Sequence, residues 1–204
     1  MDNLDGQNSI TAKGTKENLT VMFIDIRDFT TISEKYSAEE LSEILNKYFQ
    51  EIIPAVKKHK GVINKFMGDA LLIVFKGKTP EEHAKNAVLA GKDILRRIKN
   101  FQHLQEYEGK EKISAGIGIN TGEAFIGCLG TEDRCEYTVI GDTVNIASRT
   151  ESANKMYKTD FLITENTYAY VKDIADVIKI SDVQLRGKRE KVNVYEVLHV
   201  SEND

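Results

Sequence analysis

Two aspartates stand where apolar runs of the sequence end. Asp25 follows the run 21–24, and Asp69 stands beside Gly68 between two further apolar runs. If the strands formed by these runs are neighbours, both carboxylates face one small volume, where they repel each other unless a cation neutralises them. Oxygen ligands completed by substrate oxygens suit Mg²⁺ or Mn²⁺. The alternative, which the spacing leaves open, is that Asp69 completes a Gly-Asp turn and Asp25 caps the next helix.

A second polar pair lies on a predicted helix. Asn145 and Arg149 are four positions apart and therefore share a helix face, away from Val144 and Ala147. An amide and a guanidinium in this arrangement can hold a sugar oxygen and a phosphate together. The alternative is a solvated helix face with Arg149 near Glu151.

Three further cations are candidates for contact with a ligand. Lys65 stands four positions before Asp69, where its ammonium either donates to a ligand or extends into water. Arg186 and Lys188 belong to a basic turn between two predicted strands, which either contacts phosphates or is an ordinary exposed turn. The four histidines are scattered without ligand spacing, and no Ser/His/Asp or Cys/His set suggests itself.

Composition narrows the class of protein. A chain of 204 residues with 41% hydrophobic and 29% charged residues is typical of one globular domain. The net charge of −4 argues against nucleic acid as a partner, because such binders are usually basic. No signal peptide and no apolar run approaching ~18 residues is present, so we expect a cytoplasmic location, with attachment to a membrane or sensor module in the full protein left open.

The two cysteines, Cys128 and Cys135, are too few for a disulfide scaffold and lack the paired spacing of a zinc site. Free thiols are the simpler interpretation, and a bridge between the two across a loop is the alternative.

Hydrophobic periodicity predicts an α+β fold. A turn is expected at Asn120-Thr121-Gly122, and residues 1–18 and 200–204 are expected to be tails outside a domain of residues 19–199. Ser37, followed three residues later by Glu40, resembles a capping box at the start of a helix. The predicted strands are 19–26, the two strands of a hairpin over 62–75, 113–119, 123–129, 137–140, 161–163, 177–180 and 192–197, and the predicted helices are 37–58, 80–98, 143–156 and 165–171.

Three motifs together resemble the class III nucleotidyl cyclase catalytic domain. They are FIDIRDFT at 23–30, KFMGD at 65–69 and TVNIASR at 143–149. The resemblance covers about residues 19–198. It agrees with the order of the predicted elements, strand, helix, hairpin, helix, hairpin, which resembles a ferredoxin-like core (βαββαβ) with additional strands and helices at the C-terminus. It also implies a homodimer with two shared active sites at the subunit interface.

The resemblance assigns a metal site to the strand ends. Asp25 and Asp69 would bind two divalent cations per active site, Mg²⁺ or Mn²⁺, with help from the carbonyl oxygen of Ile26. Ile26 and Phe29 would also contact the substrate.

The resemblance assigns the base-reading and ribose-binding roles to residues of the opposite subunit from the metal aspartates. Lys65 and Thr138 would read the purine edge, and Asn145 and Arg149 would orient the ribose and stabilise the transition state. The terminal phosphates would be held by a basic residue of the C-terminal turn, Arg186 or Lys188.

Base choice follows from the polarity of the hydrogen bonds. Lys65 can only donate, which suits N1 of adenine and not the N1–H of guanine. Thr138 departs from the aspartate that many adenylyl members carry, although its hydroxyl can accept from the adenine amine. A second departure is Ser114, where some members have an arginine near the phosphates.

The expected function is therefore that of an adenylyl cyclase, which converts ATP into 3′,5′-cyclic AMP and pyrophosphate. The alternatives are a cyclase with relaxed preference between ATP and GTP, and a catalytically silent domain that senses nucleotides or mediates dimerisation. The polar tail at residues 1–18 suggests an upstream regulatory or membrane module that is absent from this chain.

Overall fold

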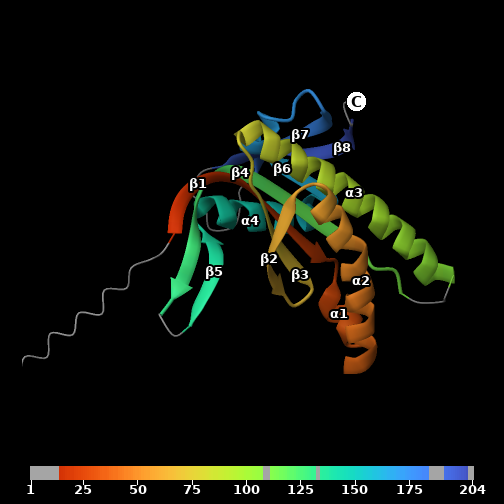
Figure 1. Ribbon diagram of the computed structural model, residues 1–204. Coiled ribbons are helices and arrows are strands. Elements are labelled where there is room, and N and C mark those ends of the chain that lie inside the picture. The colour runs from red at the N-terminus through yellow and green to blue at the C-terminus, as the bar shows by residue number, and fades with distance from the viewer. Residues whose placement is uncertain (1–13, 108–110, 132–133, 184–190, 202–204) are drawn as a thin grey trace, which may run out of the picture.

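The structure is a computed structural model that describes residues 14–107, 111–131, 134–183 and 191–201. Figure 1 shows the arrangement of its elements. In chain order they are β1 (Gly14–Ile26), α1 (Phe29–Ser33), α2 (Ala38–Lys58), β2 (Gly61–Met67), β3 (Ala70–Phe75), α3 (Pro80–Tyr107), β4 (Ala115–Gly130), β5 (Cys135–Ile140), α4 (Asp142–Tyr157), β6 (Phe161–Thr164), α5 (Glu165–Tyr168), β7 (Ala175–Val183) and β8 (Val192–Val200).

The strands form one sheet in the order β2-β3-β1-β4-β6-β8-β7, and β5 pairs with β4 outside this path. β1 lies between β3 and β4 and is antiparallel to both. The segments β1, α2, β2, β3, α3 and β4 make the βαββαβ core that was predicted, and β6, β7 and β8 extend the sheet beyond it. The expected α+β class is confirmed.

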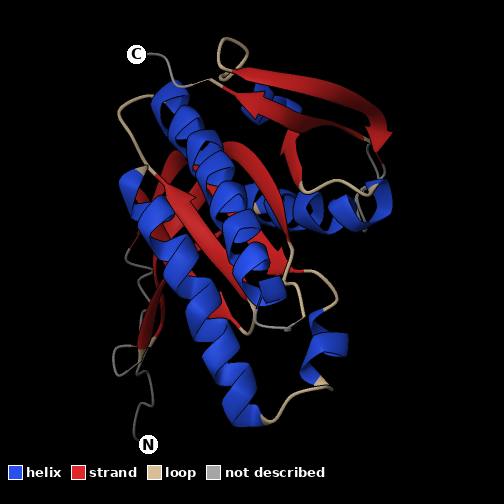
Figure 2. Ribbon diagram, turned by 90° about the vertical axis from the view of Figure 1, so that its right-hand side faces the viewer, coloured by secondary structure: helices blue, strands red, loops and turns tan. Residues whose placement is uncertain are grey.

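Both faces of β1 are covered, because its apolar run leaves no polar face. Met22 and Ile24 pack in the main core with residues of α2 and α3, which lie across one face of the sheet in Figure 2. Leu19 and Val21 pack on the other face, together with Ala147 of α4. The sheet thus holds α4 on the opposite side from the two long helices.

Helix α2 begins at the capping box that the sequence predicted. Ser37 and Glu40 form the predicted capping box, in which each side chain accepts from the backbone N–H of the other residue. Pro54 lies inside the helix, which continues unbroken to Lys58. Within the described residues, no helix is both long and apolar enough to cross a membrane.

The turn expected at Asn120-Thr121-Gly122 is wrong, because β4 runs through these residues and pairs with β1 without a break from Ala115 to Gly127. The polar side chains that suggested a turn are instead satisfied inside the protein. Thr121 Oγ1 lies 2.8 Å from Thr20 Oγ1, and Thr164 Oγ1 donates to Asn120 Oδ1 at 2.7 Å. A buried threonine and asparagine with such partners stay in a strand.

The boundaries of other elements also differ from expectation. β1 begins at Gly14, before the predicted start at 19, because its first residues continue the pairing with β4. α3 extends to Tyr107, α5 ends at Tyr168, and the short helix α1 was not predicted.

The preferred interpretation of the cysteines is also wrong. Cys128 on β4 and Cys135 on β5 form a disulfide, with their Cα atoms 5.6 Å apart. The reason is the antiparallel pairing of β4 with β5, which places Gly130 opposite Cys135 and brings Cys128 close to it.

Candidate active site

The β2–β3 hairpin carries the first half of the site. Met67 pairs with Ala70, and Gly68 has φ 69° in the left-handed region, which leaves Asp69 at the turn. β3 pairs with β1, so this turn lies beside Asp25 at the end of β1. The predicted meeting of two strand-end carboxylates is therefore present in one chain.

The two carboxylates interact directly. Burial, together with a hydrogen bond and the charge of Asp25, raises the pKa of Asp69 to about 7. The backbone N–H of Ile26 donates to Asp69 and opposes this shift. The pair therefore holds a proton, or needs a cation, near neutral pH.

Glu151 is a third carboxylate at this place, and the sequence interpretation missed its role. Burial raises the pKa of Glu151 to about 7, and the charge of Asp25 contributes. Asp25 pairs with Gly116, and a Cβ atom built at Gly116 would lie 2.7 Å from Glu151 Oε1. Glu151 follows Arg149 by two positions, which is about 200° around a helix and places it on the sheet side of α4. This helical phase was the signal available in the sequence.

Tyr48 of α2 approaches the same acids from the other face of the sheet. Its side chain is fully buried, and its hydroxyl has no hydrogen-bond partner among the described residues. Burial raises the pKa of Tyr48 well above its usual value, and the charges of Asp25, Asp69 and Glu151 add to this. The phenol therefore stays protonated beside the acid cluster.

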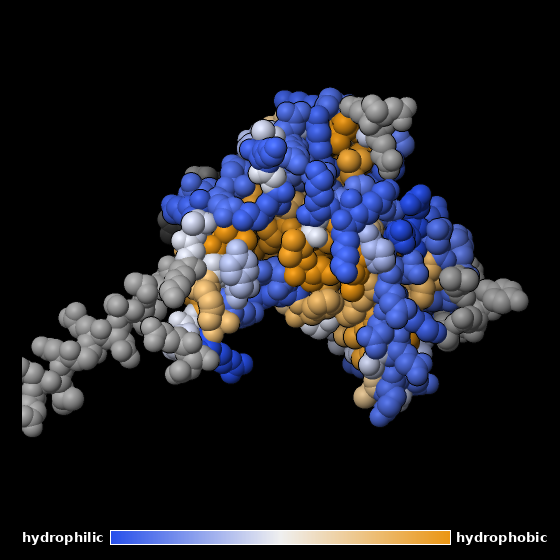
Figure 3. All heavy atoms as spheres, viewed as in Figure 1, coloured by the Kyte–Doolittle hydropathy of each residue, from blue (hydrophilic) through white to orange (hydrophobic). Residues whose placement is uncertain are grey.

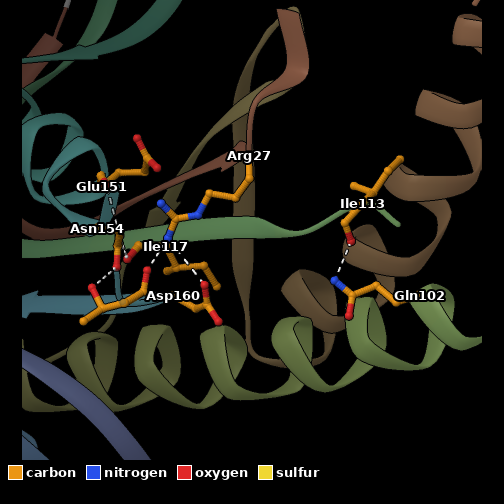
Figure 4. A network of polar contacts seen from close by, with 8 residues as sticks. Arg27, Gln102, Ile113, Ile117, Glu151, Asn154 and Asp160 are labelled. Carbon is orange, nitrogen blue, oxygen red and sulfur yellow. Dashed lines mark hydrogen bonds and ion pairs between the residues drawn. The ribbon is translucent and has the colours of Figure 1, made fainter. Parts of the chain in front are cut away.

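Helix α4 is anchored to β4 near both of its ends. At the N-terminal end, Asn120 Nδ2 donates to the carbonyl of Thr143 at 3.0 Å. At the C-terminal end, the fully buried Asn154 donates from Nδ2 to the carbonyl of Ile117 at 2.9 Å (Figure 4). Between them, Gly118 lets the backbone of α4 approach, because a Cβ there would lie 2.0 Å from the nitrogen of Glu151. These contacts determine where the side chains of α4 point.

Arg27 ties the end of β1 to the segment after α4. Its guanidinium donates to the carbonyl of Thr159 and lies 3.4 Å from Asp160 Oδ1 (Figure 4). Its positive charge also lowers the pKa of Glu151, against the effect of burial. Arg27 thus partly balances the acids while holding α4 and β1 in place.

The predicted pair Asn145 and Arg149 lies on α4 as expected. Asn145 is exposed and Arg149 is half-buried. Among the residues assigned to substrate contact, Ile26 is buried at the end of β1 and Phe29, the first residue of α1, packs partly against the main core.

The two base-reading candidates come together on neighbouring segments. Lys65 Nζ on β2 lies 3.0 Å from Glu136 Oε1 on β5. Thr138, two positions later on β5, is buried and donates to Asn64 Oδ1 at 3.4 Å, while Asn64 Nδ2 donates to the carbonyl of Tyr137. The sequence interpretation named Lys65 and Thr138 and missed Asn64 and Glu136. Lys65 and Thr138 thus lie on the contacting segments β2 and β5, where an ammonium and a hydroxyl together could read a base edge.

Comparison with known proteins identifies the family. Residues 11–199 match the family model described as "Adenylate and Guanylate cyclase catalytic domain". The chain belongs to this family. Over 191 residues, the sequence of this cyclase domain is 38% identical to that of the terminal-differentiation specific adenylate cyclase of Dictyostelium discoideum. That match covers 92% of this chain, and the chain spans only 9% of the length of that relative.

Solved structures of cyclases have the same fold. The crystal structure of the adenylyl cyclase CyaB from P. aeruginosa superimposes with a TM-score of 0.85 at 32% identity, covering 93% of this chain and 97% of that one. The crystal structure of the guanylyl cyclase Cya2 superimposes with a TM-score of 0.84 at 32% identity, and the match covers 93% of this chain and 96% of that one. Both base specificities thus occur among similar folds.

Two of the predicted site residues are not among the described residues. Arg186 and Lys188, assigned to the terminal phosphates, lie outside the described residues. Two surface hollows, one lined by Tyr36 and Phe101 and the other by Thr121 and Tyr170, contain none of the predicted site residues.

The donor set of this cyclase domain fits divalent cations. Asp25 and Asp69 supply adjacent carboxylate oxygens, and burial makes their joint negative charge unfavourable without a cation. Glu151 interacts with the pair through its charge, but among the described residues no three His, Cys, Asp or Glu side chains lie close enough together to hold a metal by themselves. Further ligands would have to come from backbone, water or substrate oxygens.

The acid pair makes the stability of the metal-free domain depend on pH. Because the pKa of Asp69 is raised from its usual 3.8 to about 7, the folded chain binds more protons than the unfolded chain between these pH values. Stability therefore falls as pH rises through this range. We expect Asp69→Asn to raise the melting temperature by about 2–6 °C at pH 8 and by much less at pH 4.

Thermal unfolding in a chelating buffer measures this effect. Glu43→Gln, at an exposed position of α2, is the matched control and should change little at either pH. Mg²⁺ or Mn²⁺ should stabilise the wild type more than Asp69→Asn. Equal effects of Asp69→Asn at pH 4 and pH 8 would contradict the interpretation.

Proposed function

We propose that this domain is an adenylyl cyclase that converts ATP into 3′,5′-cyclic AMP and pyrophosphate. The observation that carries the proposal is the meeting of Asp25 with Asp69 beside strand β2, whose Lys65 pairs with Glu136 of β5 and whose Asn64 accepts a hydrogen bond from Thr138 of β5. Membership of the family and the adenylate cyclase relative support the same reaction class. A cytoplasmic location, with an upstream regulatory or membrane module in the full protein, belongs to the proposal.

Asp25, Asp69 and the carbonyl oxygen of Ile26 would hold two divalent cations. Bound there, the cations would lower the pKa of the ribose 3′-hydroxyl and neutralise charge on the triphosphate. The proposal needs no side-chain base. The negative charge of the acid pair supports this assignment, because it requires compensation near neutral pH.

Side chains of the domain would then orient the substrate. Asn145 would bind the ribose, and Arg149 would meet the charge that grows on the α-phosphoryl oxygens as the 3′-hydroxyl attacks in line with departing pyrophosphate. Arg186 or Lys188 would hold the terminal phosphates. Lys65 would donate to N1 of adenine and Thr138 would accept from its amine.

The phase of α4 supports a site shared by two chains. Glu151 faces the acids of its own chain, whereas Arg149 lies about 200° away around the helix. Asn145 shares the face of Arg149 and is exposed. One chain therefore directs its Asn/Arg pair away from its own acids, and a second copy could bring the two halves together.

An exposed apolar surface on β2 and β5 supports the same homodimer. Val62, Phe66 and Met67 of β2 are 64%, 55% and 42% exposed, and the apolar area over β2 is visible in Figure 3. Tyr137 and Ile140 of β5 are also exposed, at 60% and 43%. Apolar side chains gathered in this way are typical of an interaction surface.

Turnover of ATP and GTP, measured separately with Mg²⁺ and with Mn²⁺, tests the proposal. We expect ATP to be cyclised at least about tenfold more efficiently than GTP, because Lys65 donates where guanine also donates. Equal turnover of the two would support the relaxed-specificity alternative, to which the similarity with the guanylyl cyclase Cya2 gives some weight. No turnover of either by a folded dimer would support the silent module.

A further inference from the structure

The disulfide between Cys128 and Cys135 stands at the outer end of the β4–β5 hairpin. The two Cα atoms are 5.6 Å apart, which is within the usual range for a bridge. Cys128 is half-buried and Cys135 is exposed. Small thiols and disulfides can therefore reach the pair while the domain stays folded.

The bridge adjoins the residues that contact β2. Glu136 directly follows Cys135, and its carboxylate lies 3.0 Å from the ammonium of Lys65. Thr138, two residues further along β5, contacts Asn64 beside Lys65. Any movement of the start of β5 is thus transmitted to the surface proposed to read the base.

Besides the Lys65–Glu136 pair, only light backbone and side-chain contacts among the described residues, such as the hydrogen bond from Thr131 N–H to the carbonyl of Arg134 at 3.0 Å, hold the start of β5 within its own chain. In the described part of the chain β5 pairs with β4 alone, and its first rungs join Gly130 to Cys135 and Leu129 to Glu136. Leu129 and Tyr137 are 52% and 60% exposed, so packing within a single chain contributes little there. A hairpin end with so few buried contacts opens easily unless it is cross-linked.

We propose that Cys128 and Cys135 are a thiol–disulfide modification site that sets the position of Glu136, and through it the presentation of Lys65 to the nucleotide. This rests on the proposed function for the role of Lys65. Nucleoside triphosphates occur in reducing compartments, where disulfides are rare and usually transient or redox-sensing. The pair is therefore placed to report on redox state.

The chemistry is thiol–disulfide exchange with a small-molecule disulfide. The thiolate of the more exposed Cys135 attacks one sulfur, breaks the S–S bond and releases one thiolate, leaving a mixed disulfide. The thiolate of Cys128 then attacks Cys135 Sγ and releases the second. The protein dithiol is oxidised, the small disulfide is reduced to two thiols, and excess thiol reverses both steps.

The expected effect concerns binding of the nucleotide. With the bridge closed, Glu136 stays beside Lys65, and the pair is ordered before ATP arrives. With the bridge open, binding has to order these side chains, so we expect KM for ATP to rise about threefold to tenfold with kcat changed less than about twofold.

The experiment equilibrates the full chain in mixtures of reduced and oxidised glutathione. Intact mass and thiol trapping measure the closed fraction, and ATP turnover and binding of a fluorescent ATP analogue are measured on the same samples. KM and the dissociation constant of the analogue should follow the closed fraction. The double variant Cys128→Ser/Cys135→Ser should keep the values of the open form in every mixture.

Each remaining outcome is decisive. A bridge that closes without any change in KM or in analogue binding overturns the coupling, and a pair that stays reduced in oxidised glutathione overturns the modification site. A Glu136→Gln chain that responds like the wild type overturns the route through Glu136. Failure of both forms to cyclise ATP or GTP overturns the proposed function instead, and the mass titration with analogue binding then decides the coupling.

Discussion

Mixing an Asp25→Ala chain with an Asn145→Ala chain is expected to restore cyclase activity that neither chain has alone. Asp25 belongs to the acid cluster at the end of β1, and Asn145 lies on the exposed face of α4. In a shared site each mixed dimer holds one complete site, formed by the intact acids of one chain and the intact α4 of the other. Random pairing of equal amounts predicts about a quarter of the wild-type activity.

A control mixture tests whether activity returns only because one inactive chain stabilises the fold of the other. Asp25→Ala mixed with Asp69→Ala puts both changes in the same half of the site, so every site in the mixed dimer lacks one acid. This mixture should stay inactive. Both mixtures are measured as ATP turnover, with dimer formation checked by light scattering. If the first mixture also stays inactive although both chains fold and dimerise, the shared-site arrangement is wrong.

Arg149→Ala is expected to lower kcat by about 10²–10³ with a much smaller change in KM. The side chain is half-buried on α4, and the proposed reaction develops charge on the α-phosphoryl oxygens only as the 3′-hydroxyl attacks. An interaction that strengthens in the transition state affects kcat more than binding of the substrate. Steady-state kinetics with ATP measure both constants.

Two further variants define the role of Arg149. Arg149→Lys keeps the charge but loses the planar fork of donors, so we expect an intermediate loss. Lys155→Ala removes a cation from the exposed end of the same helix and should leave kcat within about twofold, because Lys155 pairs with Asp28 at the surface. An effect of Arg149→Ala that appears mainly in KM would assign Arg149 to ground-state binding.

Local signals in the sequence were sufficient for several elements of the fold. The Ser37 capping box, the hairpin turn at Gly68 and the apolar run of β1 all depend on residues close in the chain, and the structure has each of them. The three motifs likewise identified the family, which the match over residues 11–199 confirms. The roles of individual site residues stay predictions.

Pairing between segments distant in the sequence decided the structure of residues 120–122. Asn120, Thr121 and Gly122 have the composition of a turn, but they lie in a strand because β1 pairs across them and Thr20 and Thr164 satisfy their side chains. No local rule contains that information, since the partners are far away in the sequence.

The acid cluster of Asp25, Asp69 and Glu151 likewise could be predicted only in part from the sequence. Asp25 and Asp69 were recognisable as strand-end carboxylates, whereas Glu151 joined them only because α4 packs directly on β4 at Gly118. The cysteines met because β5 folds back on β4. The sequence by itself determined the capping box, the turn at Gly68 and the motif residues, because these depend on neighbours along the chain. Only the tertiary structure decided which charges and thiols share a volume, because burial and distance arise from packing of remote elements.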